Sequence, residues 1–138
     1  MYKIVIDTNL WVSLLISKRL KKLKDLCLNK NVVIVSSHKI VEEYLDVSSR
    51  TKVRKYIQDE ESIFIIFDII KKYCVADPVD NVVMPEFKDQ DDLYLLALSA
   101  AVGANFLLTG DKDLLALGKY EQTEIVSFSK FMEILEES

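Results

Sequence analysis

The sequence predicts a three-layer α/β/α sandwich with a central, mainly parallel five-stranded sheet. Two observations lead to this fold class. Short apolar runs alternate with segments of helical periodicity, which is the order of a parallel sheet whose connections are helices. The runs KIVI and VVIV are almost wholly apolar, as expected of strands covered on both faces. With 138 residues, 50% of them apolar, the chain has the size of one domain spanning residues 1–138.

The predicted strands are short apolar runs rich in Val and Ile. They lie at residues 3–7, 32–36, 105–109 and 124–127, with a weaker fifth run at 73–76. Between them, helical spacing of apolar residues predicts helices over residues 20–29, 37–49, 59–72, 91–102 and 127–137. Asp89 or Asp91 could cap the fourth of these helices, and Ser127 or Ser129 the last. Residues 77–90 contain both prolines and predict a surface loop near the site.

Composition excludes several classes of function. No apolar run approaches the roughly 18 residues of a membrane span, and MYKIVID lacks the layout of a signal peptide, so we expect a cytoplasmic protein without a membrane partner. Cys27 and Cys74 have no Cys or His neighbours at ligand spacing, which argues against zinc and disulfide sites. Because His38 is the single histidine, any catalysis must run largely on carboxylates. The net charge of −4 argues against bulk attraction to nucleic acid, although basic strips occur at residues 18–24 and 52–55.

Two aspartates follow strands of the predicted sheet. Asp7 closes the first strand, and Asp111 comes just after the strand that ends at Thr109, where Gly110 permits the turn. The carboxyl ends of parallel strands meet at one edge, where the ligands of such sheets gather. Either aspartate alone could be a helix cap, but two at one edge favour a site. Asn9, two residues after Asp7, could hold a phosphate or a metal-bound water through its amide.

Two further acids come from predicted helices. A turn of about 100° per residue places Glu43 at the border of an apolar arc and Glu42 on the wet face. Glu43 is therefore favoured as the glutamate of the site, and Glu42 is the alternative if the helix is shifted by one residue. Asp91 and Asp92 compete in the same way at the start of a helix that is apolar nearly all round. Asp92 lies on the same helix face as Ser99 and is favoured as the acid of the site. Asp91 is expected to cap the helix or to support the site.

Four carboxylates in one cleft would repel one another unless a cation joined them. Oxygen ligands suit Mg²⁺ or Mn²⁺, and the corresponding chemistry is attack on a phosphodiester by a metal-activated water. We therefore predict that the direct or water-mediated metal ligands are Asp7, Asp92 and Asp111. Glu43 is expected to orient water or a second ion.

Three stretches of the chain resemble the PIN domain nucleases in their order and spacing. They are IVIDTN at the start, VVIVSSHKIVEEY around the helix glutamate, and KDQDDLYLLALSAAVGANFLLTGDKDLL as the joined third and fourth motifs. The resemblance covers nearly the whole chain. It implies a PIN-like fold and a metal-dependent nuclease that mostly cleaves RNA, with an acidic catalytic site made of Asp7, Glu43, Asp92 and Asp111.

The resemblance also implies auxiliary groups and partners. A hydroxyl commonly stands near the last acid, here Thr109, and a further acid such as Asp113 can take part. Lys112, near the rim, is expected to hold the RNA backbone without reading bases. Many members of the family are toxins of toxin–antitoxin pairs, typically dimeric and inhibited by a small antitoxin. RNA, an antitoxin and a second copy of this chain are therefore expected partners, and three apolar residues could be core or dimer surface: Ile63, Phe64 and Phe67.

Two other functions compete with this hypothesis. IVIDTN and GDKD also occur in similar form in haloacid-dehalogenase-like phosphatases. That chemistry needs a second acid where Asn9 stands and a lysine before the last acidic motif, so it is the weaker alternative. A non-catalytic PIN-like module that binds RNA or a protein is the other. The presence of all four acids argues against it, because a module without catalysis has no physical need for a cluster that repels itself.

Overall fold

The computed structural model describes residues 1–17, 19–57, 59–75 and 90–137, and the side chains of all these except residues 73–75, 90 and 91. The predicted loop at 77–90 lies outside the described residues apart from Gln90. That residue begins a helix instead.

The sheet has the strand order β3-β2-β1-β4-β6-β5. Its strands are β1 (Tyr2–Ile6), β2 (Val32–Val35), β3 (Cys74–Val75), β4 (Phe106–Leu108), β5 (Lys119–Tyr120) and β6 (Thr123–Val126). All pairings are parallel except that of β5 with β6. The five predicted strands are thus confirmed as the parallel part of the sheet. The two-residue β5 adds an antiparallel edge that the sequence analysis did not predict.

Strand register aligns the carboxyl ends of the central strands. Val5 is paired with Val35 on one side and with Leu107 on the other, and all three are buried. The ladder continues beyond the strands, because the Asp7 N–H donates to the Leu108 carbonyl at 3.0 Å and the Thr109 N–H to the Val126 carbonyl at 3.0 Å. Asp7 and Thr109 therefore leave the sheet side by side.

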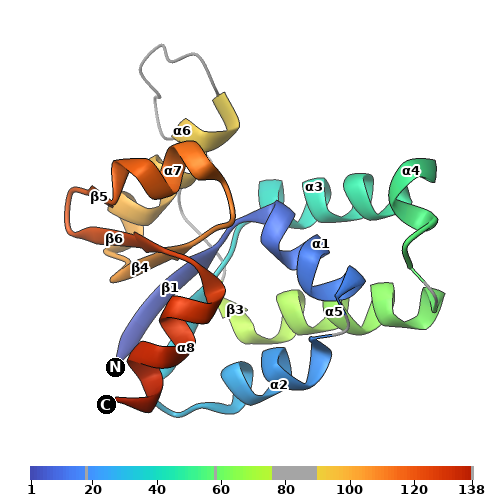
Figure 1. Cartoon of the computed structure of the whole chain (residues 1–138), viewed down its shortest axis with the longest axis horizontal. Helices are drawn as coiled ribbons and strands as arrows, with labels where there is room; N and C mark the ends of the chain where they lie inside the picture. Colours follow the sequence, from blue (N-terminus) through green and yellow to red (C-terminus); the bar gives the residue numbers. More distant parts are fainter. Residues whose placement is uncertain (18, 58, 76–89, 138) are drawn as a thin grey trace.

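The described part of the chain forms eight helices, which Figure 1 labels. They are α1 (Thr8–Ile16), α2 (Leu20–Leu28), α3 (His38–Ser49), α4 (Thr51–Arg54), α5 (Glu60–Tyr73), α6 (Gln90–Val102), α7 (Lys112–Leu117) and α8 (Phe128–Glu136). The five helices predicted from periodicity are confirmed. Of the other three helices, α1 buries residues on nearly all sides and α4 has only four residues, so neither shows a helical stripe in the sequence, and α7 is a short helix of six residues after Gly110.

The helices cover both faces of the sheet. The connections from β1 through β2 to β3 cross the sheet in one direction and those from β3 through β4 to β6 in the other. Right-handed crossovers then place α1, α2 and α5 on one face and α6 and α7 on the opposite face. α8 packs on the first of these faces through Phe131, whose ring centroid lies 5.3 Å from that of Phe106 and 6.1 Å from that of Tyr2. The predicted α/β/α sandwich is confirmed.

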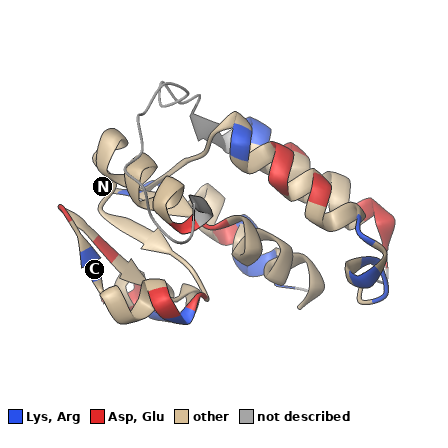
Figure 2. Cartoon of the chain, turned by 90° about the horizontal axis from the view of Figure 1, so that it is seen from above, with Lys and Arg blue, Asp and Glu red and all other residues tan. Residues whose placement is uncertain are grey.

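The charged residues do not gather on one side of the fold. Lys and Arg are interspersed with Asp and Glu along the same helices (Figure 2). The apolar residues of α5 divide between core and surface, since Ile63 is 3% exposed and Phe64 is 58% exposed, with Phe67 between them. Within the described ranges, no helix is both long enough and apolar enough to cross a bilayer.

Candidate active site

A pocket of about 280 Å³ opens at the carboxyl edge of the sheet, between the start of α1 and the turn from β4 to α7. Its walls carry two carboxylates, an amide, a hydroxyl and one apolar side chain. The lining residues are Asp7, Asn9, Leu10, Ser13, Gly110 and Asp111. No basic side chain is among these six. Two of the predicted acids therefore share a pocket rich in oxygen donors.

Asp7 is held in place by its position between β1 and α1. It is the N-cap of α1, and its Oδ1 accepts a hydrogen bond from the Asn9 N–H at 3.1 Å. Its Oδ2 accepts from the Thr109 hydroxyl at 2.7 Å. Only 6% of Asp7 is exposed, so its charge depends on these donors and on the positive end of the helix dipole.

Thr109 joins the two acids of the pocket. It is fully buried and donates its hydroxyl proton to Asp7, while its Oγ1 accepts from the Asp111 N–H at 3.0 Å. The hydroxyl thus fixes one carboxylate and the backbone of the other. The family resemblance implied a hydroxyl near the last acid, and Thr109 contacts both acids of the pocket.

The role of Gly110 differs from the one predicted from the sequence. Its φ is not in the left-handed region, and a Cβ placed there would meet nothing within 4 Å. The turn therefore does not require glycine, and that prediction was wrong. Gly110 lines the pocket instead, where the missing side chain leaves open space beside Asp111.

Asp111 caps α7 with one carboxylate oxygen. Its Oδ1 accepts from the Asp113 N–H at 2.8 Å and from the Leu114 N–H at 3.0 Å. Among the described residues, its Oδ2 has no hydrogen-bond partner and remains available for a ligand. Asp113 and Lys112 are exposed in the first turn of α7 and do not line the pocket.

Glu43 lies beside the pocket and contacts α1. Its Oε2 accepts from the Thr8 hydroxyl at 3.1 Å, and Thr8 directly follows Asp7. Glu43 is partly buried whereas Glu42 is exposed, as the helix-face argument predicts. The ammonium of Lys39 lies 3.9 Å from Glu43 Oε1. Glu43 thus contacts the residue that follows Asp7 in the chain, although Glu43 does not itself line the pocket.

Asp92, from the third motif, is not among the residues that line the pocket. Asp92 is partly buried in the first turn of α6 and is not a lining residue, and the side chain of Asp91 is outside the description. Across the described side chains, no three His, Cys, Asp or Glu residues are grouped closely enough to hold a metal ion together. The helix that carries Asp92 directly follows residues 76–89, which also lie outside the description. The predicted role of Asp92 as a ligand stays a prediction.

Three polar residues near the pocket were missed by the sequence analysis. Thr8 binds Glu43, Ser13 lines the pocket one helical turn after Asn9, and Lys39 accompanies Glu43. The spacing of four residues from Asn9 to Ser13 and from Lys39 to Glu43 was visible in the sequence, since such pairs share a helix face. Thr8 had no comparable signal, because its contact crosses from α1 to α3.

The donor set of the pocket fits a hard divalent cation. Mg²⁺ is commonly bound by one or two protein carboxylates together with water and substrate phosphates. Asp7 and Asp111 provide the carboxylates, and Asn9 and Ser13 add neutral oxygens. The pocket contains no soft sulfur or imidazole ligand among its lining residues, so these donors favour Mg²⁺ or Mn²⁺ over zinc.

Sequence comparison assigns the chain to a family. The family model for the PIN domain matches residues 3–113, a range that includes all four predicted acids. The uncharacterized protein MJ1680 of Methanocaldococcus jannaschii is 31% identical to this chain over 118 residues, which cover 83% of this chain and 74% of that protein. PIN domains are generally nucleases that use divalent metal ions. The match extends over most of the sequence and agrees with the fold, and the chain belongs to the PIN domain family.

Proposed function

We propose that this protein is a metal-dependent endoribonuclease that hydrolyses RNA phosphodiesters in the pocket between Asp7 and Asp111. One observation carries the proposal: a single buried hydroxyl, that of Thr109, binds the carboxylate of Asp7 and the backbone N–H of Asp111, so that two aspartates after neighbouring strands are held at the wall of an open pocket. If Asp7 and Asp111 served only as the N-caps of α1 and α7, a hydroxyl in contact with both residues would not be required. Two fixed carboxylates facing open space suit a cation and the phosphate that accompanies it.

The residues of the pocket would divide the work as follows. Asp7 and Asp111 would hold Mg²⁺ or Mn²⁺, and Asp92 is proposed as the third ligand. The bound ion would activate water for attack and offset charge on the phosphate. Thr109 keeps Asp7 oriented, and Glu43, which accepts from Thr8, is placed to orient water.

Other lining residues suit the nucleotide itself. The amide of Asn9 and the hydroxyl of Ser13 offer donors to phosphate or ribose oxygens. Leu10 provides an apolar wall, and Gly110 leaves room beside Asp111. Lys112 is exposed at the start of α7, which is consistent with a backbone contact at the rim.

The cellular role is proposed from the family resemblance. We expect the protein to act in the cytoplasm as the toxin of a toxin–antitoxin pair, as a homodimer that an antitoxin inhibits. The exposed Phe64 on α5 offers an apolar contact for such a dimer. Growth arrest on expression, relieved by the product of an adjacent reading frame, would support the toxin role. Sedimentation of a monomer at micromolar concentration would contradict the dimer.

RNA cleavage with added Mn²⁺ tests the proposed activity. The wild type should cleave single-stranded RNA, Asp7→Asn should not, and Glu42→Gln should match the wild type because Glu42 is exposed. Equal cleavage by wild type and Asp7→Asn, or none by either in folded protein, would contradict the proposal. Turnover of small phosphoesters by the same preparation, lost in Asp7→Asn, would favour the phosphatase alternative.

A further inference from the structure

The pocket between the two acids has walls of two kinds. The ends of β1 and β4 contribute the carboxylates of Asp7 and Asp111, whereas α1 contributes Asn9, Leu10 and Ser13. The α1 segment TNLWVSLLI contains no charged residue at all. The α1 wall therefore offers an amide, a hydroxyl and an apolar side chain to a ligand, but no cation.

The Ser13 hydroxyl is not used by the helix that carries it. Serine hydroxyls inside helices commonly donate to a backbone carbonyl of the preceding turn. Three serines of this chain do so, at donor–acceptor distances of 3.3, 2.7 and 2.8 Å: Ser48 to Leu45, Ser49 to Asp46 and Ser99 to Leu95. Ser13 is exposed, and its hydroxyl has no hydrogen-bond partner within the described ranges. Its donor and its acceptor sites are both available at the pocket wall.

Ser13 lies further along α1 from the acidic pair than Asn9 does. Asn9 is in the first turn, where its N–H donates to Asp7 Oδ1 at 3.1 Å. Ser13 follows one helical turn later, about 6 Å along the axis at a rise of about 1.5 Å per residue. In a nucleic acid strand a sugar separates each phosphate from the next. A phosphate held by a cation at the carboxylates would therefore bring the neighbouring sugar, before any second phosphate, to Ser13.

We propose that Ser13 is a specificity-determining residue that binds the ribose 2′-hydroxyl of the nucleotide next to the scissile phosphate and so favours RNA over DNA. This inference rests on the proposed function. A serine hydroxyl and a 2′-hydroxyl each donate and accept, so the two pair without any charge. A second phosphate fits this place poorly, because the pocket holds two carboxylates and its α1 wall has no cation. DNA lacks the 2′-hydroxyl and leaves Ser13 without this partner.

Substrates in which one sugar is changed at a time test the contact. A fluorescein-labelled single-stranded RNA of mixed sequence is compared, with Mn²⁺ present, with copies in which a single ribose near the cleavage site is replaced by deoxyribose. One such position should lower kcat/KM of the wild type about fivefold, as expected for one neutral hydrogen bond. Ser13→Ala should lower kcat/KM for the unmodified RNA by a similar factor and show no further loss at that position, because both changes remove the same contact.

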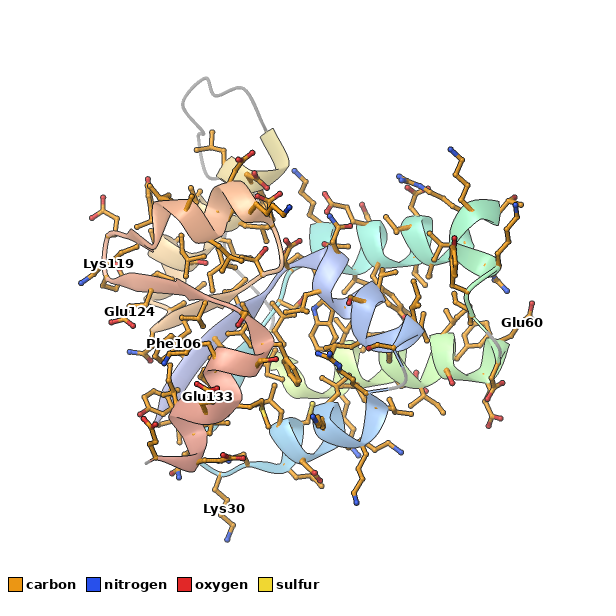
Figure 3. All side chains as sticks on the ribbon, in the orientation of Figure 1. Lys30, Glu60, Phe106, Lys119, Glu124 and Glu133 are labelled. Atoms are coloured by element: carbon orange, nitrogen blue, oxygen red, sulfur yellow. The ribbon has the colours of Figure 1, made fainter. Side chains whose placement is uncertain are left out.

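Two control variants separate this contact from general effects. Ser17 is exposed one turn after Ser13 and does not line the pocket, so Ser17→Ala should keep the full loss at the deoxyribose position. Lys30 extends into solvent just before β2, at the opposite end of the sheet (Figure 3). Lys30→Gln should change kcat/KM equally for both substrates, because a charge contact does not depend on the sugar. Circular dichroism checks that each variant is folded.

The outcomes separate this inference from the proposed activity. If RNA is cleaved and the deoxyribose copies affect the wild type and Ser13→Ala alike, the role of Ser13 is overturned while the nuclease proposal stands. If the wild type cleaves no RNA, its affinity for the same oligonucleotides is measured by fluorescence anisotropy. A preference for ribose at one position that Ser13→Ala abolishes would then uphold the ribose contact while the nuclease proposal fails. Without cleavage and without such a preference, both are overturned.

Discussion

Replacing Thr109 by valine removes one hydroxyl from the centre of the site and keeps the volume and branching of the side chain. Thr109 is fully buried, donates to Asp7 at 2.7 Å and accepts from the Asp111 N–H at 3.0 Å. Thr123 offers a matched control, because it is equally buried but donates to the neutral carbonyl of Ala104 at 2.8 Å. The two Thr→Val changes therefore differ mainly in what the hydroxyl binds.

The expected loss of stability follows from the bonds removed. A hydrogen bond to a charged group contributes about 1.5 to 3 kcal/mol, and an ordinary one about 1 kcal/mol. Thr109→Val loses one bond of each kind, so the free energy of unfolding should fall by about 2.5 to 4 kcal/mol. Thr123→Val loses one neutral bond and should cost about 1 kcal/mol. The difference arises because Asp7 remains buried with one donor fewer.

Urea denaturation of both variants measures this difference, and RNA cleavage measures its effect on the site. Thr109→Val should lower cleavage at least tenfold at a temperature where it is folded, whereas Thr123→Val should leave cleavage near the wild-type rate. Thr109→Ser should recover both properties. Equal destabilisation by the two valine variants would refute the argument that Thr109 supports a buried charge.

Three other predictions test separate parts of the account. Asp111→Asn should keep the cap of α7, while Asp111→Ala should lose about 1 kcal/mol in urea denaturation, and both should abolish RNA cleavage; cleavage by Asp111→Asn would contradict its role. Glu43→Gln should reduce cleavage and Glu42→Gln should not, and the reverse result would reassign the helix glutamate. Burial raises the pKa of the Cys27 thiol from 9.0 to about 11, so iodoacetamide near pH 8 should label it slowly in native protein and rapidly in urea, as read by peptide mass spectrometry. Because that pKa is higher in the folded state, the contribution of Cys27 to the free energy of unfolding should be constant below pH 9 and fall as pH rises toward 11.

The strands were predictable because they are buried on both faces. Runs such as KIVI and VVIV leave few other solutions, and their observed ends lie within one or two residues of the predicted ones. Burial on nearly all sides is also why α1 was not predicted. Six of the nine residues in TNLWVSLLI are buried, so the helix shows no single apolar face in the sequence. β5 was hidden for another reason. Its turn contains Glu121 at φ 52 and no glycine, so the sequence carries no ordinary hairpin signal.

That acidic residues lie together at the carboxyl edge of the sheet was predictable from the sequence, but the contacts between side chains there were not. Strand order alone brings Asp7 and Asp111 to one pocket. The bridge through Thr109 depends on hydrogen-bond geometry between neighbouring strands, which no spacing in the sequence reveals. The contact of the Lys39 ammonium with the Tyr94 ring likewise joins residues that are 55 positions apart along the chain. Pairs within one helix can be read from sequence, whereas pairs between elements require the fold.

The location of a divalent cation tests the central claim most directly. Crystals of the wild type soaked in Mn²⁺ would be measured for anomalous scattering, with Asp7→Asn crystals as the control. An anomalous peak is expected in the pocket between the carboxylates of Asp7 and Asp111, and it should be lost in Asp7→Asn. A pocket without a peak in wild-type crystals that bind Mn²⁺ elsewhere, or a peak unchanged by Asp7→Asn, would contradict it.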